Sequence, residues 1–502
     1  MRRQSGIAVP LFSLTSNHGW GIGEFPDLAD FAAWLSEAGQ SVVQILPINE
    51  MPPIETSPYS AMTAMALDPI YISLPDVPDF AAIGGEDALD GAERAEITRL
   101  RRLPRVDYAA VRWLKNRWLR RSFDRFLKME VARGTPRAAQ FDAFRAAQSW
   151  WLDEYALFRA LHAHHEERKW AEWPTALAAA DRDAVQQIRP SLILEITYRS
   201  YLQWIAAEQW GEARRRAWPV RVFGDLPFMI SADSPDVWAR QHEFRFDATI
   251  GVPPDAFSET GQDWGLPPWR MDVMQASGYT WMRNRARRYS GLYDGYRIDH
   301  LVGLYRMYVR PIDKSRTNFF EPADEASQQQ LGETLVEILR GRDSSPEPNA
   351  PSPEVFAEDL GSIPSFVRES MTRLQLPGVK VLRWEKHWDL DGTPPIDPAT
   401  FPELSVATTG THDIEPLAAT PDGETSEQRA ATLQSLLSAG SALTLLPLQD
   451  VFGWADRINT PAVVDDVNWT WRLPWPVDAW LAEDEPLARA DDLKSWTRSH
   501  NR

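Results

Sequence analysis

Cysteine is absent from the 502 residues of this chain. Disulfide bonds, thiolate-bound zinc and cysteine nucleophiles are therefore excluded together. The sequence also lacks an apolar run near the roughly 20 residues that a membrane-spanning helix needs. The basic start from Met1 to Gln4 is followed by only a short apolar run, which carries Pro10 and has no small-residue cleavage pattern. These absences predict a cytoplasmic protein with no membrane partner.

Basic residues are in the minority, with 53 Lys and Arg against 71 Asp and Glu, which gives a net charge of -18. A protein of this charge is repelled by nucleic acids and by anionic membranes, so neither is expected as a partner. A hydrophobic share of 43% is typical of a globular protein with a large core. We expect a neutral substrate, and a monomer or at most a weak homo-oligomer.

Aromatic residues are what the chain has in surplus, with 23 Trp, 20 Phe and 12 Tyr. Most of the tryptophans are expected to pack in the core or between helices. The remainder favours a carbohydrate ligand, because aromatic faces stack on the apolar C–H faces of sugars.

Apolar runs separated by helical segments predict eight strands. Such strands are joined by right-handed parallel crossovers, and eight of them close into a (β/α)8 TIM barrel. The alternative is an open doubly wound sheet, but the sequence lacks the glycine fingerprint that such a fold carries after its first strand. The predicted strands begin near Ile7, Val42, Val220, Tyr296, Val355, Val379, Val406 and Leu443.

Three parts are expected along the chain. Residues 1–74 hold the first two barrel strands and a substrate loop, 75–219 form an inserted helical subdomain, and 220–502 hold the other strands with an insertion at 231–290. Within that insertion, residues 251–269 show neither helical nor strand periodicity and are rich in Pro and Trp. A long loop of this composition is usually functional, so we expect it to bind substrate.

Four acidic residues lie at the C-terminal ends of predicted strands, the end that lines the active site of such a barrel. They are Asp225, Asp299, Glu358 and Asp413. Several carboxylates in an aromatic cleft suit glycosidic bond cleavage, in which one carboxylate attacks the sugar and a protonated one assists the leaving group.

The sequence suggests how the roles divide. Arg297 points to the same side of its strand as Asp299 and would keep that carboxylate ionised, as a nucleophile requires. Glu358 has no basic neighbour in its own segment, and a nearby carboxylate would raise its proton affinity, which suits a general acid and base. Asp413 would bind sugar hydroxyls and stabilise the cationic transition state.

Two other interpretations of these ionisable residues stay open. They could form buried ion pairs with only a structural role. They could also bind a divalent metal, although no His-x-x-x-His spacing supports a metal site and no metal is predicted. The candidate ligands for that case are Asp299, His300, Glu358, Asp359, His412 and Asp413.

Three motifs carry a resemblance to a known family: Arg297-Ile298-Asp299-His300, Ala357-Glu358-Asp359-Leu360-Gly361 and Gly410-Thr411-His412-Asp413. In this order they resemble the catalytic segments of 4-alpha-glucanotransferases, the amylomaltase or disproportionating-enzyme family of the alpha-amylase clan. The likeness extends over nearly the whole chain. Further similar segments are Ser57-Pro58-Tyr59, Gly224-Asp225-Leu226-Pro227, Pro253-Pro254-Asp255, Gly261-Gln262-Asp263-Trp264-Gly265, Pro447-Leu448-Gln449-Asp450 and Arg457-Ile458-Asn459-Thr460-Pro461.

The resemblance implies a retaining double displacement on alpha-1,4-glucans and malto-oligosaccharides. Asp299 would form the glucosyl-enzyme, Glu358 would be acid and base, and Asp413 would stabilise the transition state. The 4-hydroxyl of a second glucan would then take the glucosyl group, and no metal or cofactor is implied. Substrate-binding residues would be Tyr59, Asp225, Asp255, Trp264, Arg297, His300, His412 and Asn459.

The chain departs from the family pattern at Ala256, at Leu266 and at residues 414–417. These changes leave the three carboxylates intact and concern chain-length preference and acceptor choice. Two alternatives to transfer follow: an alpha-glucan hydrolase of the same clan, or a glucan-binding protein without turnover.

Overall fold

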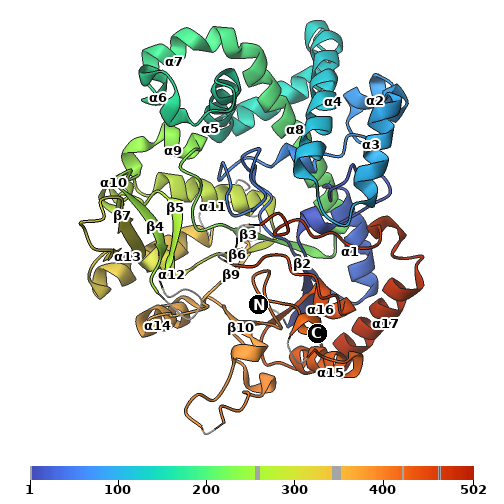
Figure 1. Ribbon diagram of the computed structural model, residues 1–502, viewed down its shortest axis with the longest axis vertical. Coiled ribbons are helices and arrows are strands. Elements are labelled where there is room, and N and C mark those ends of the chain that lie inside the picture. The colour runs from blue at the N-terminus through green and yellow to red at the C-terminus, as the bar shows by residue number, and fades with distance from the viewer. Residues whose placement is uncertain are drawn as a thin grey trace.

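A closed barrel of eight parallel strands forms the centre of the computed structural model, which describes residues 3–254, 260–341, 352–390, 392–420, 423–461, 463 and 465–502 (Figure 1). Around the barrel the strands follow the order β1-β12-β11-β10-β9-β6-β3-β2. All eight predicted strands are present, and the (β/α)8 prediction is confirmed. They are β1 (Gln4–Ala8), β2 (Val42–Gln44), β3 (Arg221–Leu226), β6 (Gly295–Ile298), β9 (Glu354–Ala357), β10 (Gly378–Val381), β11 (Ser405–Thr408) and β12 (Leu443–Pro447).

The barrel interior is filled by side chains, which explains why its strands are apolar on both faces. Phe223 of β3 and Phe356 of β9 belong to this inner cluster and are almost completely buried. The strand register determines where along the barrel axis the residues after each strand lie. Ile298 pairs with Ala357, so Asp299 and Glu358, one residue further on, leave the barrel together.

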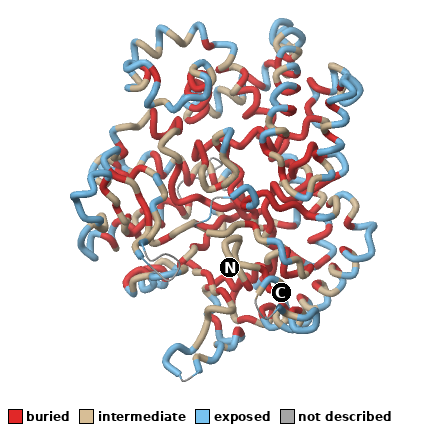
Figure 2. Tube along the Cα trace, in the orientation of Figure 1, coloured by how far each residue is buried: buried red, intermediate tan, exposed pale blue. Residues whose placement is uncertain are grey.

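Helices cover the outside of the barrel, and Figure 2 shows the buried residues concentrated at its strands. In α1 (Asp27–Glu37), Leu28, Phe31 and Leu35 fall on one face and are fully buried. The N- and C-terminal segments lie side by side: Arg502 donates a hydrogen bond to the Gln4 carbonyl at 3.0 Å. Other helices after the barrel strands are α11 (Thr280–Leu292), α12 (Val302–Tyr305), α13 (Glu325–Leu339), α14 (Ser365–Leu374), α15 (Ser426–Leu437), α16 (Leu448–Phe452) and α17 (Asp484–Ser499).

A helical insertion separates β2 from β3 and lies above the barrel in Figure 1. Its last helix, α8, packs on both α5 and the barrel helix α1, so it joins the insertion to the barrel. A buried ion pair does the same: Lys115 Nζ lies 2.6 Å from Glu24 Oε1. The helices are α2 (Pro78–Ala82), α3 (Gly91–Arg102), α4 (Tyr108–Met129), α5 (Pro136–His164), α6 (Thr175–Ala178), α7 (Arg182–Ile188) and α8 (Ile193–Ala217).

A second, antiparallel sheet with the order β5-β4-β7-β8 stands beside the barrel mouth. The prediction of an irregular loop over 251–269 is wrong for residues 251–252, which end β4, and for residues 262–266, which form β5, while residues 255–259 lie outside the described residues. No residue of β5 is fully buried, and its only apolar side chains are the half-buried Trp264 and Leu266, which alternate with the exposed Asp263 and Gly265 over too few residues to predict a strand. Its pairing needs Gly251, where a Cβ would lie 1.9 Å from the Gln262 carbonyl oxygen. The strands are β4 (Ala248–Val252), β5 (Gln262–Leu266), β7 (Met307–Pro311) and β8 (Phe319–Glu321); α9 (Pro235–Ala239) and α10 (Met271–Ala276) flank β4 and β5 in sequence.

The second sheet also reaches beyond the insertion expected at 231–290, since β7 and β8 follow the barrel strand β6. Among the described residues, no helix combines the length and apolar character needed to cross a membrane.

Candidate active site

A cleft of about 590 Å³ opens at the C-terminal ends of the barrel strands, between the barrel and the second sheet. Three carboxylates line it, each from a different loop: Asp299 after β6, Glu358 after β9 and Asp413 after β11. The other sequence-predicted residues in the lining are Tyr59, Trp264, Arg297, His300, His412 and Asn459. Asp255 and Ala256 lie outside the described residues.

Arg297 connects the acidic residues at the base of the cleft. Its Nη2 donates to Asp299 Oδ1 at 2.9 Å and lies 3.7 Å from Glu358 Oε2. Because both carboxylate oxygens are this close to one nitrogen, they are at most about 6.6 Å apart. Retaining glycosidases have carboxyl groups about 5–5.5 Å apart and inverting ones about 6.5–9.5 Å, so this geometry favours retention.

Glu358 is held by the backbone of the neighbouring loop, since the His300 N–H donates to its Oε2 at 2.9 Å. His300 has a φ of 45°, a left-handed conformation that is uncommon outside glycine. Burial raises the pKa of Glu358 to about 7, and the charges of Asp299 and Asp413 add to the effect while Arg297 opposes it. A carboxyl group with this pKa can act as acid and base at neutral pH.

The cause of the raised pKa of Glu358 differs from the one expected from the sequence, which was a neighbouring carboxylate, with no basic residue in the same segment. Burial is instead the first cause, and the guanidinium of Arg297 lies 3.7 Å away. Both facts depend on how β6 and β9 pair in the barrel.

Asp413 is the most open of the three carboxylates, with 44% of its side chain exposed. Asn459 Nδ2 donates to its Oδ1 at 2.6 Å, and His412 Nε2 lies 3.5 Å from its Oδ2. The remaining lone pairs face the cleft, where they can accept hydrogen bonds from sugar hydroxyls.

Aromatic rings form two walls of the cleft. Tyr59 stacks on His412 with 5.0 Å between ring centroids, and Trp469 packs against both rings. On the other side Trp264 meets the edge of His300 at 4.8 Å. Burial lowers the pKa of His300 to about 4 and also lowers the pKa of His412, so both imidazoles are neutral at pH 7 and can exchange hydrogen bonds with neutral hydroxyls.

The cleft lining also includes two tryptophans that the sequence did not predict there, Trp384 and Trp469. Neither belongs to a motif with a chemical role, and Trp469 meets Tyr59 only because the chain returns from 410 residues away. Its φ of 64° is a further conformational feature that sequence patterns do not reveal.

Asp225 is placed differently from the sequence expectation of a sugar contact. It is completely buried and is not part of the described cleft lining. Its Oδ2 accepts hydrogen bonds from the Tyr59 hydroxyl at 2.7 Å and from Arg297 Nη1 at 2.5 Å. In this structure Asp225 therefore orients two cleft residues from behind.

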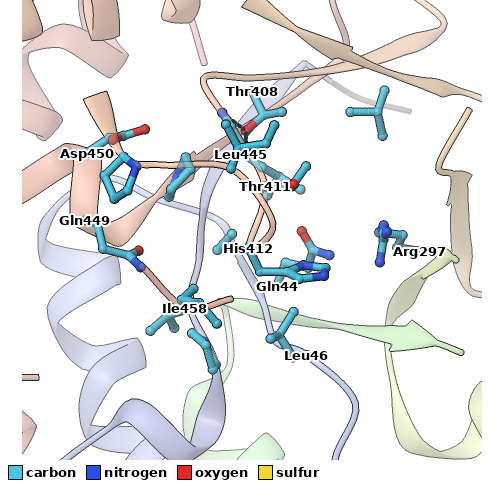
Figure 3. Close-up of a pocket in the computed structure, with 18 of the residues that line it drawn as sticks. Gln44, Leu46, Arg297, Thr408, Thr411, His412, Leu445, Gln449, Asp450 and Ile458 are labelled. Carbon is cyan, nitrogen blue, oxygen red and sulfur yellow. Dashed lines mark hydrogen bonds between the residues drawn. The ribbon is translucent and has the colours of Figure 1, made fainter. Parts of the chain in front are cut away.

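A smaller chamber of about 70 Å³ lies next to the cleft inside the barrel (Figure 3). Arg297, Glu358 and His412 line both spaces. Gln449 and Asp450 lie opposite Arg297 in the view of Figure 3, and Thr408 donates to the Gly410 carbonyl at 2.7 Å. The chamber has room for a few water molecules beside the carboxylates.

The histidines and carboxylates of the described residues form no group of three with an arrangement suited to a metal ion.

The fold and the cleft define an enzyme that acts on glycosidic bonds. A family model described as 4-alpha-glucanotransferase matches residues 9–478. The 4-alpha-glucanotransferase of Chlamydia caviae is 31% identical over 98% of this chain and 94% of that protein, and that of Thermus thermophilus is 30% identical over 94% and 95%. An amylomaltase from Streptococcus agalactiae, solved in complex with acarbose, superimposes with a TM-score of 0.82 at 26% identity and 100% coverage of both chains. This chain belongs to the 4-alpha-glucanotransferase family, and the resemblance found in its motifs is confirmed.

Proposed function

We propose that this 4-alpha-glucanotransferase moves alpha-1,4-glucan segments between malto-oligosaccharides through a covalent intermediate on Asp299. The observation that supports the mechanism is the shared proximity of Asp299 and Glu358 to Arg297, which keeps one oxygen of each carboxylate within about 6.6 Å of the other and so excludes most of the inverting range. In the first step Asp299 attacks the anomeric carbon while Glu358 protonates the leaving 4-oxygen. The glucosyl group is then attached to Asp299, and Glu358 is ionised.

In the second step the ionised Glu358 takes the proton from the 4-hydroxyl of an acceptor glucan. That oxygen attacks the anomeric carbon, Asp299 leaves, and a new bond of the original anomeric configuration forms. A pKa near 7 suits both roles of Glu358, because neither protonation state is costly at neutral pH.

The other cleft residues have supporting roles in this proposal. Asp413 stabilises the cationic transition state and is oriented by Asn459. Tyr59, Arg297, His300 and His412 surround the sugar at the cleavage point, and Trp264 offers an aromatic face to the glucan. Asp225 holds Tyr59 and Arg297 in place.

Products from maltotriose test the function directly. Transfer is expected to give glucose together with maltotetraose, maltopentaose and longer chains, with each new bond in the alpha configuration by NMR. Glucose and maltose alone would identify a hydrolase instead. Unchanged maltotriose, with binding measurable by calorimetry, would identify a glucan-binding protein.

Replacing Trp264 by alanine should weaken glucan binding more than folding. An aromatic contact contributes about 0.5–1.5 kcal/mol, so KM for maltotriose is expected to rise about 2- to 12-fold. Trp113, which is 59% exposed on α4, offers a matched control, and Trp113→Ala should leave KM unchanged. Unfolding of Trp264→Ala at the assay temperature would show that this side chain serves the fold instead.

The compartment and the oligomeric state belong to the same proposal. A chain without cysteine has no disulfide to lose in a reducing environment, which agrees with the cytoplasm. A monomer with the cleft on one end of its barrel needs no second copy to complete the site. Sedimentation of the purified protein at micromolar concentration would test the monomer.

A further inference from the structure

Glu415 stands two residues after Asp413, in the loop that follows β11. Its side chain is held between two arginines from other loops. Arg383 Nη1 lies 3.0 Å from Glu415 Oε1, and Arg457 Nη1 lies 3.5 Å from Glu415 Oε2. None of these three described residues lines the cleft, although Glu415 lines the smaller chamber next to it.

Arg457 connects Glu415 to Asp413, the third carboxylate of the cleft. Its Nη2 donates to the backbone carbonyl of Asp413 at 2.9 Å, and its Nε donates to the carbonyl of Asn459 at 3.3 Å. Asn459 in turn donates to the Asp413 carboxylate at 2.6 Å. One arginine therefore positions both the backbone of Asp413 and the side chain that orients its carboxylate.

Arg383 connects Glu415 to the segment that carries Trp384, a residue of the cleft lining. It belongs to the short 3₁₀ segment Leu382–Trp384 after β10, and its Nη2 donates to the backbone carbonyl of Glu415 at 3.1 Å. Trp384, the next residue, lines the cleft. Glu415 thus connects the loops that follow β10, β11 and α16, in addition to the direct contacts of Asn459 and Arg457 with the loop after β11.

We propose that Glu415, through its contacts with Arg457 and Arg383, is a positioning residue that sets the location of the Asp413 carboxylate for the transferase reaction. This inference rests on the proposed role of Asp413. The ion pairs are partly exposed, with about a third of the Glu415 and Arg457 side chains accessible, so they add little to folding stability. Their effect is on the geometry of a transition-state contact, where a displacement near 1 Å is costly.

The first test compares two neutral variants. Glu415→Gln is expected to lower kcat for maltotriose by about 10- to 100-fold with little change in KM, because Asp413 acts on the transition state. The matched control is Glu385→Gln, which removes a similar ion pair between Glu385, in the loop after β10, and Lys380 of β10; neither residue lines the cleft, and kcat should be unchanged. A melting temperature within about 2 °C of the parent would show that Glu415→Gln is folded.

The second test asks whether Glu415 acts through Asp413. In an Asp413→Asn background the further change Glu415→Gln should have no effect on kcat, since the group that it positions is already lost. Equal losses in both backgrounds, a rise in KM alone, or full activity of Glu415→Gln would each overturn the proposal.

Failure of the proposed function has a different signature. If the parent enzyme releases glucose from maltotriose without making longer chains, the proposal of transfer is wrong. The effect of Glu415→Gln in the parent and in the Asp413→Asn background can still be measured on hydrolysis, and it tests the role of Glu415 independently. If Asp413→Asn alone keeps full kcat, the role of Asp413 is wrong and the inference about Glu415 falls with it.

Discussion

Asp299→Asn is expected to lower the rate of maltotriose disproportionation by about 10⁴-fold or more, the largest loss of any substitution in the cleft. The change keeps the shape of the side chain and its place beside Arg297 but removes the nucleophile. No glucosyl-enzyme can then form. Intact-mass measurement after addition of a fluorinated glucosyl donor should show a covalent adduct in the parent enzyme and none in the variant.

A smaller variant makes this expectation sharper. Asp299→Ala leaves space where the carboxylate was, and azide added with an activated alpha-glucosyl donor should attack from that side and give the beta-glucosyl azide. A matched control is Asp272→Asn, because Asp272 is exposed on α10 away from the cleft. An adduct that persists in Asp299→Asn, or azide product from the parent as well, would assign the nucleophile elsewhere.

Glu358→Gln is expected to lower turnover of ordinary glucans by about 10²- to 10⁴-fold, the usual share of a general acid and base. A donor with a fluoride leaving group needs no protonation, so its first step should still proceed and the glucosyl-enzyme should accumulate. Asp359→Asn is the control: it neutralises the adjacent carboxylate, which accepts a hydrogen bond from the Val379 N–H outside the cleft. Equal losses with both kinds of donor would exclude the acid role.

The pH profile of the parent enzyme follows from the same residue. Glu358 must be protonated to assist the leaving group, and its pKa is raised to about 7. The kcat/KM for maltotriose should therefore be sustained below pH 7 and fall about tenfold per pH unit well above it. The alkaline decline should vanish with the fluoride donor and in Glu358→Gln. A decline that remains in both would belong to another group.

Several features of the site could be predicted because they are encoded locally. Each barrel strand is a short apolar run, and Asp299 and Glu358 follow such runs directly, so the barrel rule places them at one mouth before any contact is known. Arg297 and Asp299 are two residues apart where β6 ends, which is enough to predict their contact. The ordered motifs around them were sufficient to indicate the family.

Other features could not be predicted from the sequence, because they depend on contacts between segments that are far apart along the chain. β5 has no buried residue and becomes a strand only by pairing with β4 in the second sheet. Asp225 looks like another strand-end ligand, yet Tyr59 and Arg297 cover its carboxylate. Residues whose role depends on a partner far along the chain leave no periodic signal.

By itself the sequence determined the parallel barrel and the three acidic side chains at its mouth, because periodicity and strand ends are properties of neighbouring residues. Its motifs indicated the glucan-acting family only through their resemblance to known proteins. Only the tertiary structure decided that Arg297 bridges Asp299 and Glu358, that burial raises the pKa of Glu358, and that Glu415 reaches Arg383 and Arg457. Desolvation and contacts across loops arise when the barrel closes and brings together segments that no local pattern connects.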